Sequence, residues 1–330
     1  MKSTIKKWLP ALLLCAAQPA LAAETTSAVA LPNLGYEGNV TPLPPQDGAA
    51  APKQWDRALP FFAQRVVDRG IDLPNPYDVG FSYYYTEQNM LLSNLKVSVN
   101  DNPLRSAGFV AFPKSTLENH SEQVQVGAWL FPFMNVYGIA GHISGGGDIG
   151  LSIKADDAVQ FITGIDRCSG RRKPDWCGKT LEATARANYD GYSYGVGMTL
   201  VGNLDRLFFS LPVTYTVSNV SMSDTDAKSL NVAPRVGVNW QLGDYGTVMT
   251  YAGATYLHTT VTITGSATLP TSETDIGEDT KVNFSIDEKI ANPWNGLAGF
   301  HWMVNRNISL MAELAFGARQ GYILSAFYRF

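Results

Sequence analysis

A period of two in side-chain character runs along residues 77–330, and it limits the folds open to this chain. Successive side chains of a β-strand point to opposite faces, so an alternating stretch makes a sheet with two unlike faces. Apolar side chains alternate there with small or polar ones. The clearest stretches are 77–86, 95–100, 123–130, 137–143, 192–200, 207–217, 232–242, 294–304, 308–316 and 322–330.

The composition of the two faces distinguishes a soluble β-sandwich from a membrane barrel. One face repeatedly carries Tyr, Trp, Phe and Leu, while the other carries Gly, Ser, Thr and Asn. A soluble sandwich would bury the first set and place charges on the second, yet only 16% of the residues are charged and 11% are aromatic. After residue 22 no stretch is apolar enough for a membrane helix. In lipid such a chain satisfies its backbone only as a closed barrel.

The predicted fold class is therefore all-β, a transmembrane antiparallel β-barrel over residues 77–330. The ambiguous stretch 248–258 and a weaker candidate within 149–165 bring the expected number of strands to about 12. A barrel of this size has a narrow lumen, since wide aqueous channels need about 16 to 18 strands.

The N-terminus predicts export. Residues 1–22 have a basic start, an apolar run from Trp8 to Ala17 and a small-x-small end at Ala20-Leu21-Ala22, which is typical of a secretory signal peptide. The run is too short for a transmembrane helix. Cys15 would be removed with the peptide, because the bulky Leu14 before it does not suit lipoprotein processing.

Export also changes the charge of the chain. Loss of residues 1–22 takes three lysines and no acids from 25 basic and 29 acidic residues, so the net charge goes from −4 to −7. A nucleic-acid-binding protein would show a basic face instead. We therefore expect no nucleic-acid partner.

Residues 23–76 are rich in Pro, Gly and Ala and show no period, which predicts an irregular N-terminal extension. Leu59, Phe62 and Val66 share helical spacing beside three arginines, so a short amphipathic helix is possible within 58–69. Such a helix would either rest in the barrel mouth or cover its periplasmic rim.

The final ten residues, GYILSAFYRF, end on Phe330, with Tyr328 on the same face of the strand. This pattern resembles the C-terminal signal by which the barrel-assembly machinery recognises outer-membrane proteins. The resemblance covers one strand. It implies that machinery as a partner and the outer membrane of a Gram-negative bacterium as the location.

Connection lengths orient the predicted barrel. Short connections occur at 202–203, 243–246 and 305–307, and long ones near 166–187, 218–230 and 259–292. Membrane barrels have short periplasmic turns and long outer loops, so a periplasmic C-terminus places the long segments outside. Residues 100–122 conflict with this order, because a long connection falls where a periplasmic turn is expected.

Cys168 and Cys177 enclose the short segment CSGRRKPDWC. In an oxidising compartment, this spacing predicts a disulfide. Zinc is the weaker alternative, since no histidine lies nearby.

The segment GHISGGG places His142 two residues before Ser144. It resembles the His-x-Ser motif of outer-membrane phospholipases and lipid A deacylases, in which a base activates a hydroxyl. The asparagine that follows the serine in those families is replaced here by Gly145. Tyr137, Ile139 and Ile143 form the apolar face of the strand, so His142 and Ser144 are expected in the lumen as a polar pair rather than a catalytic one.

Parity places four other ionisable side chains in the lumen: Lys96, Arg235, His301 and Glu313. Their mixed signs suit either a ladder of ion pairs that closes the interior or the walls of a narrow path. No ion preference follows from so few charges.

The function expected from the sequence is a narrow pore for small solutes. The alternative is a surface or anchor protein that acts through its outer loops, and a lipid-modifying enzyme comes third. Charged loops, basic over 166–187 and acidic over 267–290, suggest contact with lipopolysaccharide or simple solvation. No cofactor or metal is expected; outer-membrane lipid and a small solute are the expected partners.

Overall fold

The structure of the protein, a computed structural model, describes residues 54–69, 73–99, 102–171, 173–204, 206–221, 223, 225–269 and 280–330. The chain divides into two units, residues 1–31 and 32–330, and all described residues belong to the second. The predicted signal peptide, with Cys15, lies outside the described residues, and so does most of the predicted extension 23–76.

The described strands join in one 14-stranded sheet, and every pair of neighbours is antiparallel. Alternating aromatic and β-branched residues favour this extended backbone. The strands are β1 Tyr77–Val99, β2 Arg105–Ser106, β3 Val110–Ala111, β4 Ser115–Phe131, β5 Met134–Lys154, β6 Thr180–Leu204, β7 Leu207–Val220, β8 Ala227–Val232, β9 Arg235–Gln241, β10 Thr247–Leu269, β11 Thr280–Ile290, β12 Trp294–Met303, β13 Ile308–Phe316 and β14 Arg319–Arg329.

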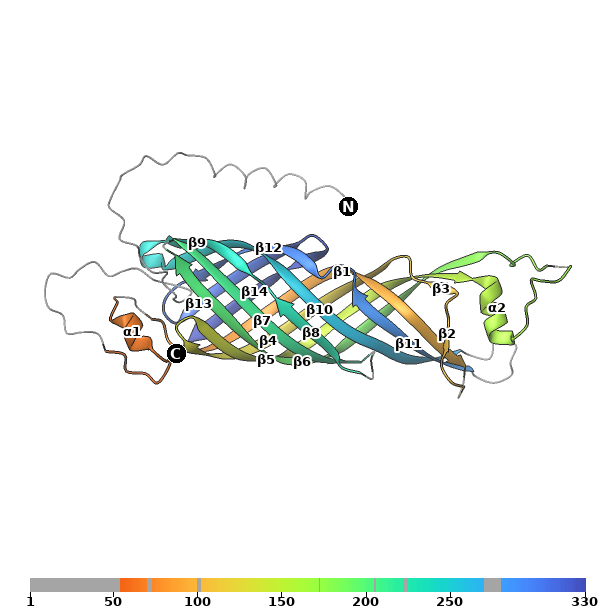
Figure 1. Ribbon diagram of the computed structural model, residues 1–330, viewed down its shortest axis with the longest axis horizontal. Coiled ribbons are helices and arrows are strands. Elements are labelled where there is room, and N and C mark those ends of the chain that lie inside the picture. The colour runs from red at the N-terminus through yellow and green to blue at the C-terminus, as the bar shows by residue number, and fades with distance from the viewer. Residues whose placement is uncertain are drawn as a thin grey trace, which may run out of the picture. The chain divides into compact units, whose positions relative to one another are not determined.

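The first and last long strands close the sheet into a barrel. Strand β1 pairs with β4 along one edge and with β14 along the other, where Val79 lies opposite Tyr328 and Tyr85 opposite Tyr322. In the near part this closure gives every strand a partner on both sides, which membrane barrels require. We call the end that holds Phe330 the near end and the opposite end the far end (Figure 1).

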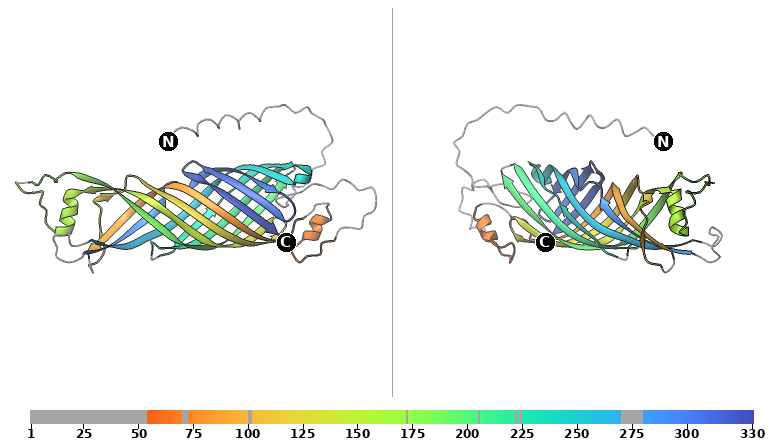
Figure 2. Two further views of the ribbon diagram at one scale, coloured as in Figure 1. Left: turned by 180° about the vertical axis from the view of Figure 1, so that it is seen from behind. Right: turned by 45° about the vertical axis from the view of Figure 1, so that its right-hand side comes forward.

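The ring changes its membership along the barrel. In the near part it runs β1, β4, β5, β6, β7, β9, β10, β12, β13, β14 and back to β1. In the far part β11 takes the place of β12, β13 and β14, and pairs directly with β1 and β10. Figure 2 shows the short hairpin of β13 and β14, in dark blue, confined to the near part.

The predicted number of about 12 strands is wrong, since the sheet of the described residues has 14. Strands β1 and β5 are each continuous where the sequence suggested two strands, and β11 lies in a segment interpreted as a loop. In addition, β8 and β9 are separated only by Ala233 and Pro234, because proline cannot donate to the ladder. The long strands extend past the membrane, where the alternation that identifies lipid-facing strands is lost.

The structure places the short and the long connections at opposite ends of the barrel, with bounds that differ from the predicted ones. The short turns that follow β4, β6, β9 and β12 lie at the near end, and the longer connections between β1 and β4 and between β5 and β6 lie at the far end. The segments near 218–230 and 259–292 are mostly strand rather than loop. Because β1 is continuous to Val99, the connection 100–114 falls at the far end, and the conflict over residues 100–122 disappears.

Two α-helices lie at opposite ends of the barrel (Figure 1). Helix α1, Ala63–Val67, is at the near end, and α2, Ala155–Thr163, is at the far end. The weak strand candidate in 149–165 is therefore wrong beyond Lys154. Asp156 and Asp157 favour the helical N-terminus, and Gly164, with φ 71°, ends the helix. No helix in the described residues is long and apolar enough to span a membrane.

The outer wall of the near part carries an apolar band bounded by aromatic side chains. Tyr77, Tyr328 and Phe330 mark its near border, and Tyr192, Trp294 and Tyr322 its far border. Exposed aliphatic and Phe side chains lie between them: Val79, Phe81, Val124, Val126, Val196, Val236, Phe300, Leu310, Leu314 and Leu324. Such a band between aromatic girdles is how a barrel faces lipid. The predicted fold class, a transmembrane antiparallel β-barrel, is confirmed.

Candidate functional site: the barrel lumen

The lumen of the membrane-spanning part is lined by polar side chains that bond to each other. Asp78 accepts hydrogen bonds from Gln125 at 3.2 Å and from Asn135 at 2.8 Å, and the hydroxyls of Ser82 and Ser325 are 2.8 Å apart. The free space here is small, about 180 Å³. The networks therefore hold the near lumen together rather than line an open channel.

Arg235 and Glu313 form an ion pair within this near lumen. Arg235 Nε lies 2.9 Å from Glu313 Oε2, and the Glu313 side chain is only 3% exposed. The guanidinium also sits over the ring of Tyr251, 5.5 Å from its centroid. His301 is buried and borders the same cavity. Three of the four lumen residues expected from the sequence thus lie together, and two of them are paired.

Apolar side chains fill the rest of the near lumen and close its mouth. Phe208, Met249 and Leu297 are among a buried cluster on the inner wall. At the mouth, Trp129 and Val201 pack against Ala63 and Val67 of α1 and against Leu73. Of the two positions open for a helix in the extension, the structure places α1 against inward-facing residues of the mouth. The barrel is therefore closed at its near end.

Beyond the far aromatic border, the inner wall changes character. A second cavity, of about 550 Å³, extends from the level of Gln125 and Glu313 into this part of the lumen, and we call it the far chamber. Its lining includes many aliphatic and aromatic side chains: Met90, Leu92, Leu117, Ile139, Ile143, Ile149, Val220, Leu257, Val261, Ile263, Phe284, Ile286 and Ile290. The membrane-spanning strands have apolar side chains outside and polar ones inside. In the far part of the barrel, many apolar side chains face inward and polar side chains face outward.

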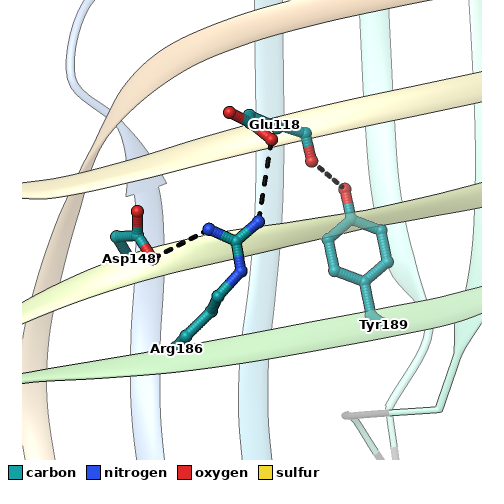
Figure 3. A network of polar contacts seen from close by, with 4 residues as sticks. All are labelled: Glu118, Asp148, Arg186 and Tyr189. Atoms are coloured by element: carbon teal, nitrogen blue, oxygen red, sulfur yellow. Dashed lines mark hydrogen bonds and ion pairs between the residues drawn. The ribbon is translucent and has the colours of Figure 1, made fainter.

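The outside of the far strands is correspondingly polar (Figure 3). Arg186 of β6 lies between two carboxylates of neighbouring strands, 3.1 Å from Asp148 Oδ1 and 3.8 Å from Glu118 Oε2. All three side chains are about half exposed. An exposed network contributes little to stability, but it shows that this wall faces water.

Two ionisable side chains face each other across the far chamber. Glu288 of β11 lies opposite Leu92 and Val261 in the register, and it borders the chamber together with Tyr189 of β6. Both positions lie beyond the membrane-spanning band. Desolvation raises the pKa of Glu288 to about 7. Burial, and in addition the charge of Glu288, raise the pKa of the Tyr189 hydroxyl.

Sequence reasoning missed Glu288 and Tyr189. A signal was present, since Phe284, Ile286 and Ile290 alternate with polar residues in 283–290. The acidic residues of that segment indicated a solvated loop instead. Asp287 and Lys289 do point outward, and hydrogen bonds from Asn94 and then Thr262 lower the pKa of Asp287.

Lys96 was expected in the lumen, but the structure places it outside. The register between β1 and β11 shifts between Ser93 and Lys96, where Asn94 has a positive φ of 55°. Such a bulge adds a residue to one strand and turns the following side chains to the opposite face. Lys96 is exposed and lies opposite Ser285, on the side of Asp287.

His142 and Ser144 were also expected in the lumen, and this orientation is wrong. Tyr137, Ile139 and Ile143 line the lumen, so the intervening side chains face outward. The expectation failed because the apolar face of β5 faces the far chamber, not lipid. His142 packs edge-on against Tyr192, which is 71% exposed, and its Nε2 lies 2.9 Å from Asp190 Oδ2.

The two residues are not arranged as a nucleophile and its base. In the described part of the chain, the Ser144 hydroxyl makes no hydrogen bond to His142. His142 is instead held by Asp190.

Cys168 and Cys177 form the predicted disulfide in the far-end connection that follows α2, with Cα atoms 5.7 Å apart. The described residues contain no cluster of three or more His, Cys, Asp or Glu suited to a metal ion. At the near end, Phe330 stacks on Tyr328, with ring centroids 6.2 Å apart, and bonds through its backbone to Tyr77.

No protein-family model and no curated protein sequence match the chain. Among solved structures it is similar to the outer membrane protein OprG from Pseudomonas aeruginosa, with 11% identity, a TM-score of 0.37 and coverage of 78% of this chain and 97% of that one. It is also similar to the translocator domain of autotransporter NalP from Neisseria meningitidis, with 10% identity, a TM-score of 0.32 and coverage of 78% of this chain and 90% of that one. For the Pseudomonas putida toluene transporter TodX, the identity is 7%, the TM-score is 0.28, and the match covers 77% of this chain and 89% of that one.

These neighbours are distant, so conclusions on function depend on the residues of this chain. Its closed sheet, lipid-facing band and aromatic girdles define an outer-membrane β-barrel. The chain combines a narrow, largely filled lumen near one end with a larger cavity, partly lined by apolar side chains, toward the other end.

Proposed function

We propose that this barrel takes up small apolar solutes through the outer membrane of a Gram-negative bacterium. The far chamber is the observation that carries the proposal. Apolar side chains turned inward on strands whose outside is polar serve no structural need of a membrane barrel, whereas pockets for small molecules are mostly apolar with a few polar groups. The chamber volume, about 550 Å³, suits a one- or two-ring solute.

The predicted signal peptide and the terminal strand with Tyr328 and Phe330 support the same location, with the barrel-assembly machinery as the partner in insertion. The short near-end turns belong in the periplasm, and the far end projects outside. Outer-membrane lipid faces the apolar band, and lipopolysaccharide borders the strands above it.

A solute that enters from outside leaves water for the far chamber, which is favourable by about 25 cal/mol per Å² of apolar surface buried. Its further passage requires the closed near lumen to open. Trp129 and α1 cover the mouth, and the Arg235–Glu313 pair crosses the path above it. The chain thus combines an accessible binding chamber with a closed exit.

Binding of naphthalene to the purified protein, followed by fluorescence, tests the proposal. Ala187 borders the chamber, so Ala187→Trp should fill part of it and weaken binding by at least about tenfold. Ala252 faces away from the lumen and is exposed, so Ala252→Trp is the matched control and should bind like the parent. Absence of saturable binding to the parent protein would favour the surface-anchor alternative.

A further inference from the structure

One carboxylate stands alone among the chamber's apolar side chains. The ionisable residues that border the far chamber are Tyr84, Tyr137, Tyr189, Glu288, Glu313, Arg319 and Tyr322. Glu313 is paired with Arg235, at the base of the chamber. Glu288 lies closer to the far end, on the inner face of β11, where Ile286 and Ile290 flank it.

The other charged and titratable groups near Glu288 are engaged elsewhere. The Tyr189 hydroxyl donates to Asn119 Oδ1 at 3.0 Å, and it lies 3.5 Å from the carbonyl of Glu118 (Figure 3). Arg319 donates to Thr255 Oγ1 at 2.6 Å and to backbone carbonyls of 292 and 293. Within the described residues, no side chain donates a hydrogen bond or an ion pair to Glu288.

Glu288 is partly buried, and an unpaired carboxylate among apolar side chains is costly because it loses part of its water without a replacement. The chain offers no structural reason for this cost: an apolar residue on the same face would pack with Ile286 and Ile290. A ligand with a positive group would offset it. The aromatic rings that border the chamber, such as Phe284 and Tyr189, also attract a cation through their faces.

From this arrangement, and building on the uptake function proposed above, we infer that the far chamber binds small apolar amines, with the ammonium group on the Glu288 carboxylate. The apolar body of the ligand occupies the aliphatic lining. A neutral ligand of the same shape forgoes the ion pair, and an anionic one meets a like charge.

Calorimetric titration of the full-length protein in detergent, at about pH 8.5, tests this with three probes of nearly equal shape: 4-phenylbutylamine, 4-phenylbutanol and 4-phenylbutyrate. The amine carries its charge at that pH, because an alkylamine titrates near 10.4. We expect the amine to bind at least about tenfold more tightly than the alcohol, and the carboxylate to bind least. Lowering the pH to about 5.5 should weaken amine binding by at least about tenfold, since Glu288 then has to lose a proton first.

Variants identify the residue responsible. Glu288→Gln should bind amine and alcohol equally, whereas Glu288→Asp should retain part of the amine preference. Glu87→Gln is the matched control, because Glu87 is an exposed carboxylate on the outside of β1, and it should keep the full preference. Heat-modifiable migration reports that each variant is folded.

Two negative results have different meanings. Equal affinity of the parent protein for amine and alcohol would overturn the inference while leaving apolar uptake in place. Failure of all three probes to bind would overturn both proposals. An amine preference that persists in Glu288→Gln would also overturn the inference, since another group would then hold the ammonium.

Discussion

Arg235 Nε of β9 lies 2.9 Å from Glu313 Oε2 of β13, and the pair joins two non-adjacent strands inside the lumen. Both side chains are largely buried, so each charge depends on the other for the solvation it has lost. Strands β9 and β13 are separated in the sheet by β10 and β12. The pair therefore links two strands that do not pair directly, at the level where the polar lumen meets the far chamber.

Breaking this ion pair on one side should destabilise the barrel. Glu313→Gln leaves the Arg235 guanidinium buried without its counter-ion, and we expect a loss of about 3 kcal/mol in the free energy of unfolding. The double variant Arg235→Met with Glu313→Leu removes both charges and should recover most of that loss. Urea titration followed by tryptophan fluorescence measures both. Equal stability of the parent and Glu313→Gln would contradict this role of the pair.

The closure at the near end should be removable without loss of the barrel. Val67 is buried against Trp129 and Val201, so Val67→Asp places a carboxylate in an apolar contact and should release α1 from the mouth. We expect conductance in planar bilayers to rise only slightly above that of the parent, because the near lumen keeps its small free space of about 180 Å³. Arg69→Asp, at an exposed position just after the helix, is the control and should leave conductance unchanged. A closed Val67→Asp variant would show that the lumen itself is the barrier.

Alternation was a good guide wherever a strand separates lipid from the lumen. From Tyr77 to Tyr85, every second side chain had to be apolar because it touches lipid, and the same holds from Tyr322 to Phe330. The fold class and the location of Arg235, His301 and Glu313 followed from that rule. Over these stretches, contact with lipid alone decides which side chains face outward.

The same rule misled beyond the far aromatic border. Ile143, opposite Gly191, lies there and is apolar because it faces the chamber, whereas Ile139, opposite Gly195, lies within the band and faces the same chamber. Parity read from them as lipid-facing residues put His142 on the wrong side. Lys96 was misplaced for a different reason: no pattern in the sequence announces the bulge at Asn94, which arises from the pairing with β11. Long-range pairing of this kind is set by the tertiary structure.

The bulge itself can be tested by labelling. The only cysteines left after signal cleavage are expected to be the disulfide-bonded Cys168 and Cys177, so an introduced cysteine is a clean reporter. Lys96→Cys should react rapidly with a bulky, membrane-impermeant maleimide, because the side chain lies outside. Leu92→Cys lines the chamber and should react more slowly by at least about tenfold, because the reagent must enter it. If Leu92→Cys reacted faster than Lys96→Cys, Lys96 would lie in the lumen, as the sequence predicted.

Loss of the disulfide should spare the barrel. The bond closes a short loop, which limits its stabilising effect to the connection after α2. Reduction, or Cys168→Ser with Cys177→Ser, should leave the urea midpoint of the barrel unchanged within about 0.5 kcal/mol. Protease should cut the connection at 166–179 faster in the variant. A large fall in barrel stability would mean that this loop supports the far strands.

The free carboxylate in the chamber makes a prediction about pH. The pKa of Glu288 is raised to about 7 in the folded protein, against about 4.3 for an unfolded chain. Between these values the folded state holds a proton that the unfolded state has lost, so the free energy of unfolding should fall as the pH rises from about 4.3 to 7, and level off above that. A difference of about 2.7 pKa units corresponds to about 4 kcal/mol, which is the largest fall that this residue can cause. Glu288→Gln should remove that component and be more stable than the parent above pH 7, while Glu87→Gln should follow the parent curve.

Saturating 4-phenylbutylamine should reverse the trend for the parent protein, since the ammonium stabilises the ionised form. Identical pH profiles for the parent and Glu288→Gln would show that the carboxylate is hydrated in the chamber and carries no such cost.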